Sequence, residues 1–218
     1  MTLDIVILGV FVADTAYRAQ RQPRLGETIL GQSFALGPGG KGSNQSVAAG
    51  MAGASVGFIT KLGKDPFADM ALATWKKAGV TSLATQHADD YTGAAYIFVD
   101  ENTGDNAIIV CPGAAATINR SDIDSHAEVI KHCKVLMTQL EQPIDAAEYA
   151  LACARKAGAT TILNPAPAVE LPTSMIALCD FVTPNEIEAE TITGITVNSP
   201  KDAVAAAEAL LAKGAGGA

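Results

Sequence analysis

The sequence lacks the excess of basic residues that nucleic-acid binding requires. Its 218 residues carry 15 Lys and Arg against 23 Asp and Glu, which gives a formal net charge of -8 at pH 7. The basic residues are scattered along the chain rather than gathered in a stripe, so they create no positive field that would attract a phosphate backbone. We therefore expect no nucleic-acid partner.

Cysteine and histidine are too few and too widely spaced for a metal centre. The chain has four cysteines and three histidines, with no C-x-x-C pair and no histidines at ligand spacing. His132 and Cys133 are neighbours, but adjacent residues seldom face one another on a helix or strand. Four cysteines are predicted to be buried, small apolar residues of a reducing compartment: Cys111, Cys133, Cys153 and Cys179.

Long apolar runs are also missing. No run approaches the ~20 residues that a membrane span needs, and residues 1–4 show neither the basic segment nor the cleavage signature of a signal peptide. The composition, 49% hydrophobic, is sufficient for a sizeable core in one large domain, or in one domain with a small appendage. We expect a soluble, cytoplasmic protein with no membrane partner.

A glycine-rich segment, residues 36–45, is the most informative feature that is present. Its four glycines are Gly37, Gly39, Gly40 and Gly42. Glycine lets a ligand touch the backbone and allows positive φ angles. A helix that begins near Ser43 would add free N–H groups and the positive end of its dipole, which suits a polyhydroxylated or anionic ligand. Alternatively, the glycines serve only a tight turn.

Strand-like and helix-like segments alternate along most of the chain, which predicts an α/β fold with a mostly parallel sheet covered by helices on both faces. Glycines follow several of the expected helices, as is typical of helix ends. The expected strands are 5–10, 55–61, 134–139, 160–163 and 180–183, and the expected helices are 67–78, 144–157 and 200–213.

Two segments interrupt this alternation. Residues 15–36 and 94–110 mix polar and apolar residues with a period near two, and a turn signal occurs at residues 102–105. They are predicted to form antiparallel strands of a small β-sheet outside the main sheet. Because the glycine-rich segment follows the first of them, the small sheet would be a lid that excludes water from a reacting phosphoryl group.

Polar residues follow several of the predicted strands, at the edge where ligands bind in open α/β sheets. Asp14, Glu141 and Asn164 each come after a strand. Asn185 and Glu188 lie three residues apart on one face of a helix, where an amide and a carboxylate could hold hydrated magnesium. Each residue also has a structural interpretation, as a turn cap, a turn before proline or an acidic helix N-terminus.

Taken together, these motifs resemble those of the ribokinase-like (PfkB) family of carbohydrate kinases. The matching motifs occur in the family's order and span nearly the whole chain: residues 39–45, 63–67, 139–141, 164–168, 184–188 and 193–194. The resemblance implies a three-layer α/β/α sandwich with a small β lid over residues 1–218. It also implies ATP and magnesium as cofactors, transfer of the ATP γ-phosphoryl group to a sugar hydroxyl, and a homodimer formed through the lid.

The resemblance also assigns roles to individual residues. Asn185 and Glu188 would organise the phosphate and the magnesium, with Glu188 as the metal ligand. Residues expected to contact the sugar are Asp14, Gly39, Gly40, Lys41, Asn44 and Glu141.

Two departures from the family pattern modify these expectations. Val12 replaces an asparagine that precedes the sugar-binding aspartate by two residues, and its apolar side chain favours a deoxy sugar, another pentose or a different polyol over ribose. The family's Gly-Ala-Gly-Asp motif, which supplies an anion hole and the general base, does not occur, because Gly217 follows residues 214–216 where the acid would stand. We therefore expect no catalytic base in this chain. The adenine pocket and a monovalent-cation site, such as one for K⁺, would belong to the same absent region.

Two other functions compete with a sugar kinase. Residues 37–42 formally satisfy G-x-G-x-x-G, the fingerprint of an NAD-dependent oxidoreductase, but that fingerprint should directly follow the first buried strand. A non-catalytic sugar-binding module would fit a chain without the general base. Sugar binding without ATP turnover would distinguish such a module from a kinase.

Overall fold

Six parallel strands form the central sheet of the protein, whose computed structural model describes residues 3–218. Their order across the sheet is β12-β11-β10-β1-β4-β6. Every pair of neighbours is parallel, with Ile7 of β1 opposite Met137 of β10 on one side and Phe58 of β4 on the other. The strands are β1 (Ile5–Leu8), β4 (Val56–Ile59), β6 (Thr81–Ser82), β10 (Val135–Thr138), β11 (Thr160–Leu163) and β12 (Phe181–Val182).

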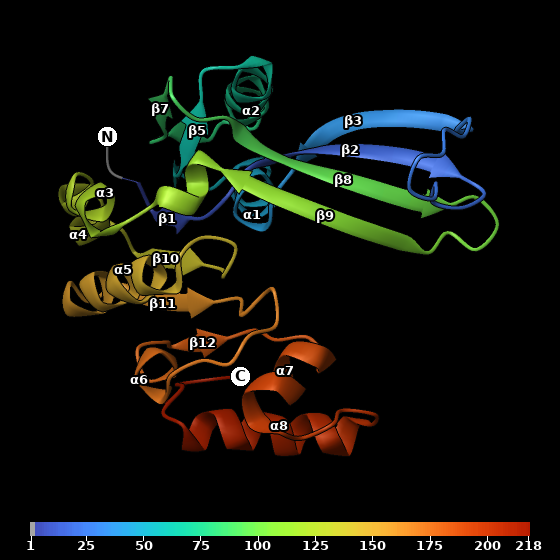
Figure 1. Cartoon of the computed structure of the whole chain (residues 1–218). Helices are drawn as coiled ribbons and strands as arrows, with labels where there is room; N and C mark the ends of the chain where they lie inside the picture. Colours follow the sequence, from blue (N-terminus) through green and yellow to red (C-terminus); the bar gives the residue numbers. More distant parts are fainter. Residues whose placement is uncertain (1–2) are drawn as a thin grey trace.

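Helices cover both faces of this sheet, so the predicted three-layer α/β/α arrangement is confirmed (Figure 1). Val6 and Leu8 of β1 join a core with α3 (Arg120–Asp124), α4 (Ala127–His132) and α5 (Ile144–Lys156). Ile7 points to the opposite face, where α2 (Pro66–Lys77) buries Trp75 and α1 (Lys41–Met51) packs beside it. Burial on both faces explains why β1 is a continuous apolar run in the sequence.

The remaining helices lie beside β12 at the edge of the sheet (Figure 1). They are α6 (Thr173–Ile176), α7 (Glu186–Thr193) and α8 (Pro200–Ala212), and α7 packs against α8. Local signals account for their limits: Ser199 caps α8 ahead of Pro200, and α7 ends at Gly194 with a left-handed φ of 76°. Several predicted limits were wrong: the first strand ends at Leu8 and α1 begins at Lys41. The expected strand 55–61 is divided, because residues 56–59 form β4 of the central sheet and Lys61 begins a strand of a separate two-stranded sheet.

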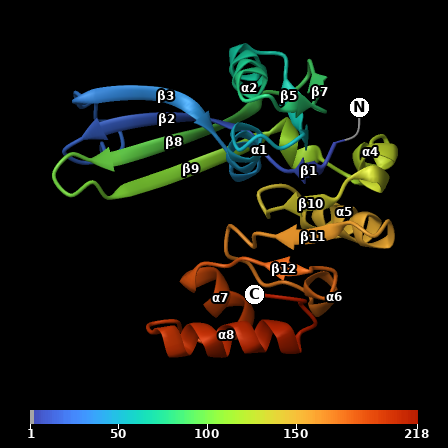
Figure 2. The same ribbon diagram turned by 180° about the vertical axis from the view of Figure 1, so that it is seen from behind.

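A second sheet of four strands leaves the main body and is called the projecting sheet below (Figures 1 and 2). Its strands are β3 (Ser33–Gly39), β2 (Val12–Ala19), β8 (Thr92–Asp100) and β9 (Asn106–Gly113), in that order. The prediction of antiparallel strands was wrong for the central pair, because β2 and β8 are parallel. Both strands begin at the main body and run outward. The hairpin β2–β3 and the hairpin β8–β9 therefore pair with each other through the first strand of each.

The base of the projecting sheet is held by the segment around Asp65, the N-cap of α2. Its Oδ2 accepts a hydrogen bond of 2.7 Å from the Thr92 amide at the start of β8, and its Oδ1 accepts one of 2.9 Å from Ala68. Gly63 ends β5 (Lys61–Gly63), which pairs with β7 (Thr85–His87). A short helix, η1 (Ala114–Thr117), follows β9. The motif at residues 63–67 therefore anchors a strand.

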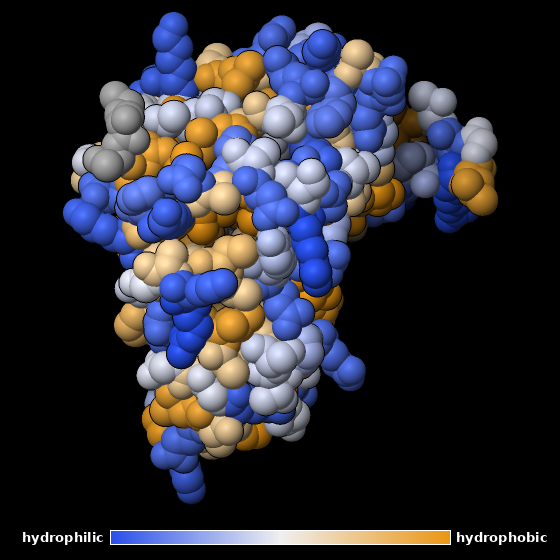
Figure 3. Space-filling model, turned by 90° about the vertical axis from the view of Figure 1, so that its left-hand side faces the viewer, coloured by the Kyte–Doolittle hydropathy of each residue, from blue (hydrophilic) through white to orange (hydrophobic). Residues whose placement is uncertain are grey.

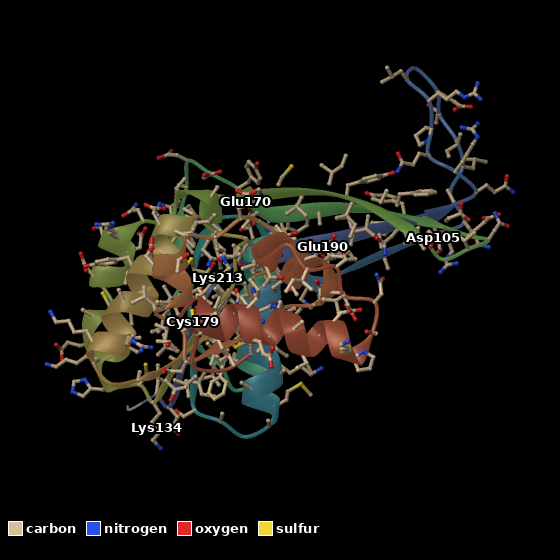
Figure 4. The ribbon with its side chains drawn as sticks, turned by 90° about the horizontal axis from the view of Figure 1, so that it is seen from below. Asp105, Lys134, Glu170, Cys179, Glu190 and Lys213 are labelled. Carbon is tan, nitrogen blue, oxygen red and sulfur yellow. The ribbon has the colours of Figure 1, made fainter. Side chains whose placement is uncertain are left out.

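The far end of the projecting sheet is exposed. Asp105 lies in the turn between β8 and β9 at the tip, and the loop joining β2 to β3 stands away from the strands (Figure 4). The opposite end of the molecule has a mixed surface, in which hydrophilic side chains separate small apolar patches (Figure 3). Among residues 3–218, no helix has the length and apolar character needed to cross a membrane.

The four cysteines are all free, and the prediction that they are buried holds for Cys133 and Cys179. Cys153 is half-buried. Cys111 is exposed, because it lies on β9 at the edge of the projecting sheet. Burial raises the pKa of the Cys179 thiol to about 12, which leaves it protonated and unreactive at neutral pH.

Candidate ligand-binding site

A cavity of about 580 Å³ opens where the projecting sheet meets the carboxyl ends of the central strands. The N-terminus of α1 forms one wall, and the segment after β10 forms another. Five of the six residues expected to contact a sugar line it: Asp14, Gly40, Lys41, Asn44 and Glu141. The sixth, Gly39, packs directly against Asp14.

Two glycines allow the loop before α1 to pass close to its neighbours. Gly40 has φ 87°, and a Cβ placed there would lie 2.3 Å from the Val10 carbonyl oxygen. A Cβ on Gly39 would lie 2.3 Å from the Asp14 carboxylate. Gly37 has no such neighbour. Close approach therefore explains Gly39 and Gly40, the two glycines that were predicted to be part of the site.

Glu141 completes the N-terminus of α1. Gly40 is the N-cap and has no side chain to offer, and Glu141 Oε2 accepts a hydrogen bond of 2.7 Å from the Lys41 amide. The carboxylate thus comes from a segment 100 residues away in the sequence. It also lies at the positive end of the helix dipole, which favours its ionised form.

The two carboxyl groups of the cavity share an environment that disfavours charge. Burial raises the pKa of Glu141, and the neighbouring carboxylate of Asp14 raises it further, against the opposing effect of the Lys41 amide. Burial also raises the pKa of Asp14. Carboxylates accept hydrogen bonds and do not donate them when ionised, so this pair suits a ligand with hydroxyl donors.

The wall facing these acids is apolar and comes mainly from the projecting sheet. Val12 on β2 is 4% exposed and lines the cavity two residues before Asp14. The sequence reasoning identified Val12 but missed the rest of this wall: Val10, Ala95, Ile97, Ile108, Val110, Pro112, Leu140 and Pro167. Leu140 and Pro167 lie in recognised motifs. The residues of β8 and β9 have no local signal, because strand pairing alone brings them to the cavity.

Asn185 and Glu188 lie outside this cavity. They form a reciprocal capping box at the start of α7: Asn185 Oδ1 accepts from the Glu188 amide at 2.8 Å, and Glu188 Oε2 accepts from the Asn185 amide at 2.9 Å. Glu188 is buried, whereas Asn185 is exposed beside a hollow between α7 and α8. The motif therefore stabilises a helix N-terminus, as its structural interpretation predicted.

The chemistry of these groups gives a limited fit to magnesium. No group of three or more His, Cys, Asp or Glu side chains in residues 3–218 could hold a metal ion. Magnesium keeps several waters and can be bound through one or two carboxylates together with substrate phosphates. One oxygen of Glu188 is engaged in the capping box, so this residue fits the role of a single carboxylate ligand and would need substrate phosphates and water to complete the coordination of magnesium.

The sheet, the cavity at its carboxyl edge and the projecting sheet beside it together define an α/β protein with a cavity at a helix N-terminus that suits a small polar ligand. Residues 2–217 match the model of the pfkB family of carbohydrate kinases. The chain belongs to this family, and the predicted fold and family are confirmed.

Individual relatives agree with that assignment. The chain is 36% identical to deoxyribokinase of Salmonella typhi over 97% of this chain and 70% of the relative. It is 38% identical to ribokinase of Mus musculus over 96% of this chain and 65% of the relative. The ribokinase of Arabidopsis thaliana, solved in complex with ribose and ATP, has the same fold, with a TM-score of 0.85 at 23% identity over 99% of this chain and 70% of that one.

The position of the glycine-rich segment in the fold bears on the competing oxidoreductase function. The G-x-G-x-x-G segment runs along β3 of the projecting sheet into α1, whereas a dinucleotide fingerprint follows a strand of the main parallel sheet. The topology and the family match therefore both oppose an NAD-dependent oxidoreductase.

Proposed function

We propose that this chain provides the sugar-binding part of an ATP-dependent sugar kinase, which transfers the γ-phosphoryl group of ATP to a sugar hydroxyl. The observation that carries the proposal is the placement of Asp14 and Glu141 around the N-terminus of α1, in a cavity with an apolar opposite wall. The Arabidopsis relative that was solved with ribose and ATP supports both ligands. Phosphoryl transfer depends mainly on positioning and charge neutralisation, so a fixed sugar cradle is a large share of the catalytic task.

The residues of the cavity have complementary roles in this proposal. Asp14 and Glu141 accept hydrogen bonds from sugar hydroxyls, and the backbone at Gly39 and Gly40 lies against the sugar ring. Lys41 and Asn44, on the first turn of α1, supply donors at the cavity wall. Asn185 and Glu188 help to place magnesium and phosphate, and bound magnesium would neutralise phosphoryl charge.

Val12 sets the preference among sugars. A hydroxyl directed at its buried apolar side chain would lose water without gaining a partner, which costs about 1–3 kcal/mol. We therefore propose that the site binds deoxyribose more tightly than ribose, in line with its similarity to a deoxyribokinase.

Calorimetric titration of the chain with the two sugars tests this preference. The Val12→Asn variant should shift the ratio of the two dissociation constants toward ribose by about tenfold, the value of one hydrogen bond of ~1.4 kcal/mol. An unchanged ratio would refute the role of Val12. Binding of both sugars without phosphorylation in the presence of ATP and magnesium would favour the non-catalytic sugar-binding module.

The exposed apolar side chains of the projecting sheet support a homodimer. Four large apolar residues that are about half exposed share the face of this sheet that points away from the cavity, on three of its four strands: Tyr17, Phe34, Leu36 and Ile109. Contiguous exposed apolar surface of this kind marks an interaction site. Light scattering after size-exclusion chromatography should give twice the 22.3 kDa chain mass, and Ile109→Glu should restore the single-chain mass. A single-chain mass for the wild type would refute the dimer.

A further inference from the structure

Three amide side chains form a continuous chain of hydrogen bonds that begins at the buried Gln139, after β10, and reaches the exposed loop before α7 through two half-buried residues. Gln139 Nε2 donates to Gln45 Oε1, and Gln45 Nε2 donates to Asn164 Oδ1 at 3.3 Å. Asn164 Nδ2 then donates to the Thr183 carbonyl oxygen at 3.1 Å. We call Gln139, Gln45 and Asn164 the amide chain.

The Thr183 carbonyl fixes the direction of every link. A carbonyl oxygen only accepts, so Asn164 must turn its Nδ2 toward Thr183 and its Oδ1 toward Gln45. Gln45 must then offer Nε2 to Asn164 and Oε1 to Gln139. All three orientations follow from one backbone group at the far end, so the amide chain has a single polarity.

This polarity leaves one buried oxygen without a hydrogen-bond partner. Gln139 is fully buried, and its Oε1 has no partner. It lies where the backbones of Gly9 and Gly42 cross, since a Cβ on either glycine would be 2.4 Å or 2.8 Å from it. An unpaired buried polar group costs about 1–3 kcal/mol. Apolar side chains of similar shape would avoid that cost, so packing alone does not explain these amides.

The ends of the amide chain lie at the two halves of the proposed active site. Gln45 is on α1, one residue after Asn44 and one turn after Lys41, yet it does not line the cavity itself. Thr183 immediately precedes the Pro184-Asn185 segment that begins α7. We propose that Gln45, Gln139 and Asn164 are positioning residues, which hold the sugar-binding turn of α1 at a fixed separation from the Asn185–Glu188 turn of α7.

The assignment of the two ends to sugar and phosphate rests on the proposed function, whereas the mechanical link does not. Backbone bonds already join β10 to β11 and β11 to β12, but α1 lies on a face of the sheet and has no such ladder to α7. Gln45 provides the side-chain connection between them. Sugar bound against α1 would then alter the start of α7 through this connection.

The first experiment measures the link without any ligand. Native-state hydrogen exchange, followed by two-dimensional NMR of the labelled chain, reports the Asn185 and Glu188 amides, both of which donate within the capping box. Gln45→Met removes both bonds of Gln45 at similar size. We expect exchange at these two amides to accelerate about tenfold, with less than a twofold change in Gln86→Met, whose Nε2 contacts only the Gly63 carbonyl. Equal exchange in the two variants would overturn the proposal.

The second experiment uses deoxyribose as the probe and the NMR shifts of the same amides as the signature. In the wild type, the sugar should shift the amides of Lys41 and of residues 183–188, whereas in Gln45→Met only Lys41 should respond. Retention of the distant shifts in the variant would overturn the coupling. If deoxyribose and ribose shift nothing in the wild type, the proposed function fails, and the ligand-free exchange still decides whether the link exists.

A second variant separates the link from the packing around Gln45. Asn164→Asp keeps the acceptor for Gln45 but loses the donor to Thr183, and the side chain is half-buried, so the variant should fold. It should accelerate exchange at Asn185 and Glu188 while leaving the Lys41 amide unchanged. Acceleration at Lys41 as well would show general loosening and contradict a positioning role.

Discussion

Gly40→Ala should destabilise the protein by about 2–6 kcal/mol. The residue has φ 87° and ψ 130°, a conformation that costs a residue with a Cβ about 1–3 kcal/mol. Its Cβ would also lie 2.3 Å from the Val10 carbonyl oxygen and 2.9 Å from the Phe11 Cα. Both are backbone atoms that cannot rotate away, and forced packing of this kind costs about 1–3 kcal/mol more. The total is a large share of the roughly 5–15 kcal/mol that stabilises a typical protein.

Urea unfolding followed by tryptophan fluorescence measures this loss. Trp75 is the only tryptophan and is fully buried between Phe11 and Phe58, with ring centroids 5.9 and 5.0 Å away. Its Nε1 donates to Ser43 Oγ on α1 at 2.9 Å, so its emission reports the seating of that helix. Gly37→Ala is the matched control, because its Cβ would meet no atom within 4 Å and its φ is not positive. A loss below about 1 kcal/mol for Gly40→Ala, or an equal loss in the control, would refute the reasoning.

Further perturbations test the electrostatics. Because burial raises the pKa of Glu141, the folded chain keeps this proton to higher pH than the unfolded chain, and its contribution to stability falls as pH rises through the raised pKa. Glu141→Gln should therefore gain stability relative to wild type in thermal unfolding as pH rises above the ordinary pKa of a glutamate side chain; a constant difference would contradict this. The ion pair of Lys61 Nζ and Asp122 Oδ2 is 2.8 Å long and its lysine is 7% exposed. Asp122→Ala should cost about 3–5 kcal/mol in urea unfolding, and adding Lys61→Met should recover most of it. Additive losses would argue against coupling.

Most elements could be predicted because their signals are local. The alternation of apolar strands with helices that end at glycine predicted the parallel sheet, and the expected helices 67–78 and 200–213 begin within one residue of the observed starts at Pro66 and Pro200. The orientation of β2 against β8 could not be predicted in this way. Both segments alternate with period two, and that period is the same for parallel and antiparallel neighbours.

The candidate site shows the same division. Asp14, Gly40 and Glu141 were predicted from their motifs, and the structure brings them into one cavity. The sequence analysis expected an acidic helix N-terminus at residues 185–188, but the reciprocal capping box of Asn185 and Glu188 was found only in the structure, and their role toward magnesium stays a prediction. The orphan oxygen of Gln139 had no sequence signal, because a glutamine beside a strand gives no sign of which donors will face it.

The sequence by itself determined which segments form strands and helices, where the chain can turn, and which acids and glycines are available to a ligand. Those properties depend on residues within a few positions of one another. Only the tertiary structure decided that Glu141 caps a helix 100 residues away, that Ile108 and Val110 line the same cavity, and that Gln45 is connected through Asn164 to the loop before α7. These contacts depend on how distant segments pair and pack, and local patterns do not encode that choice.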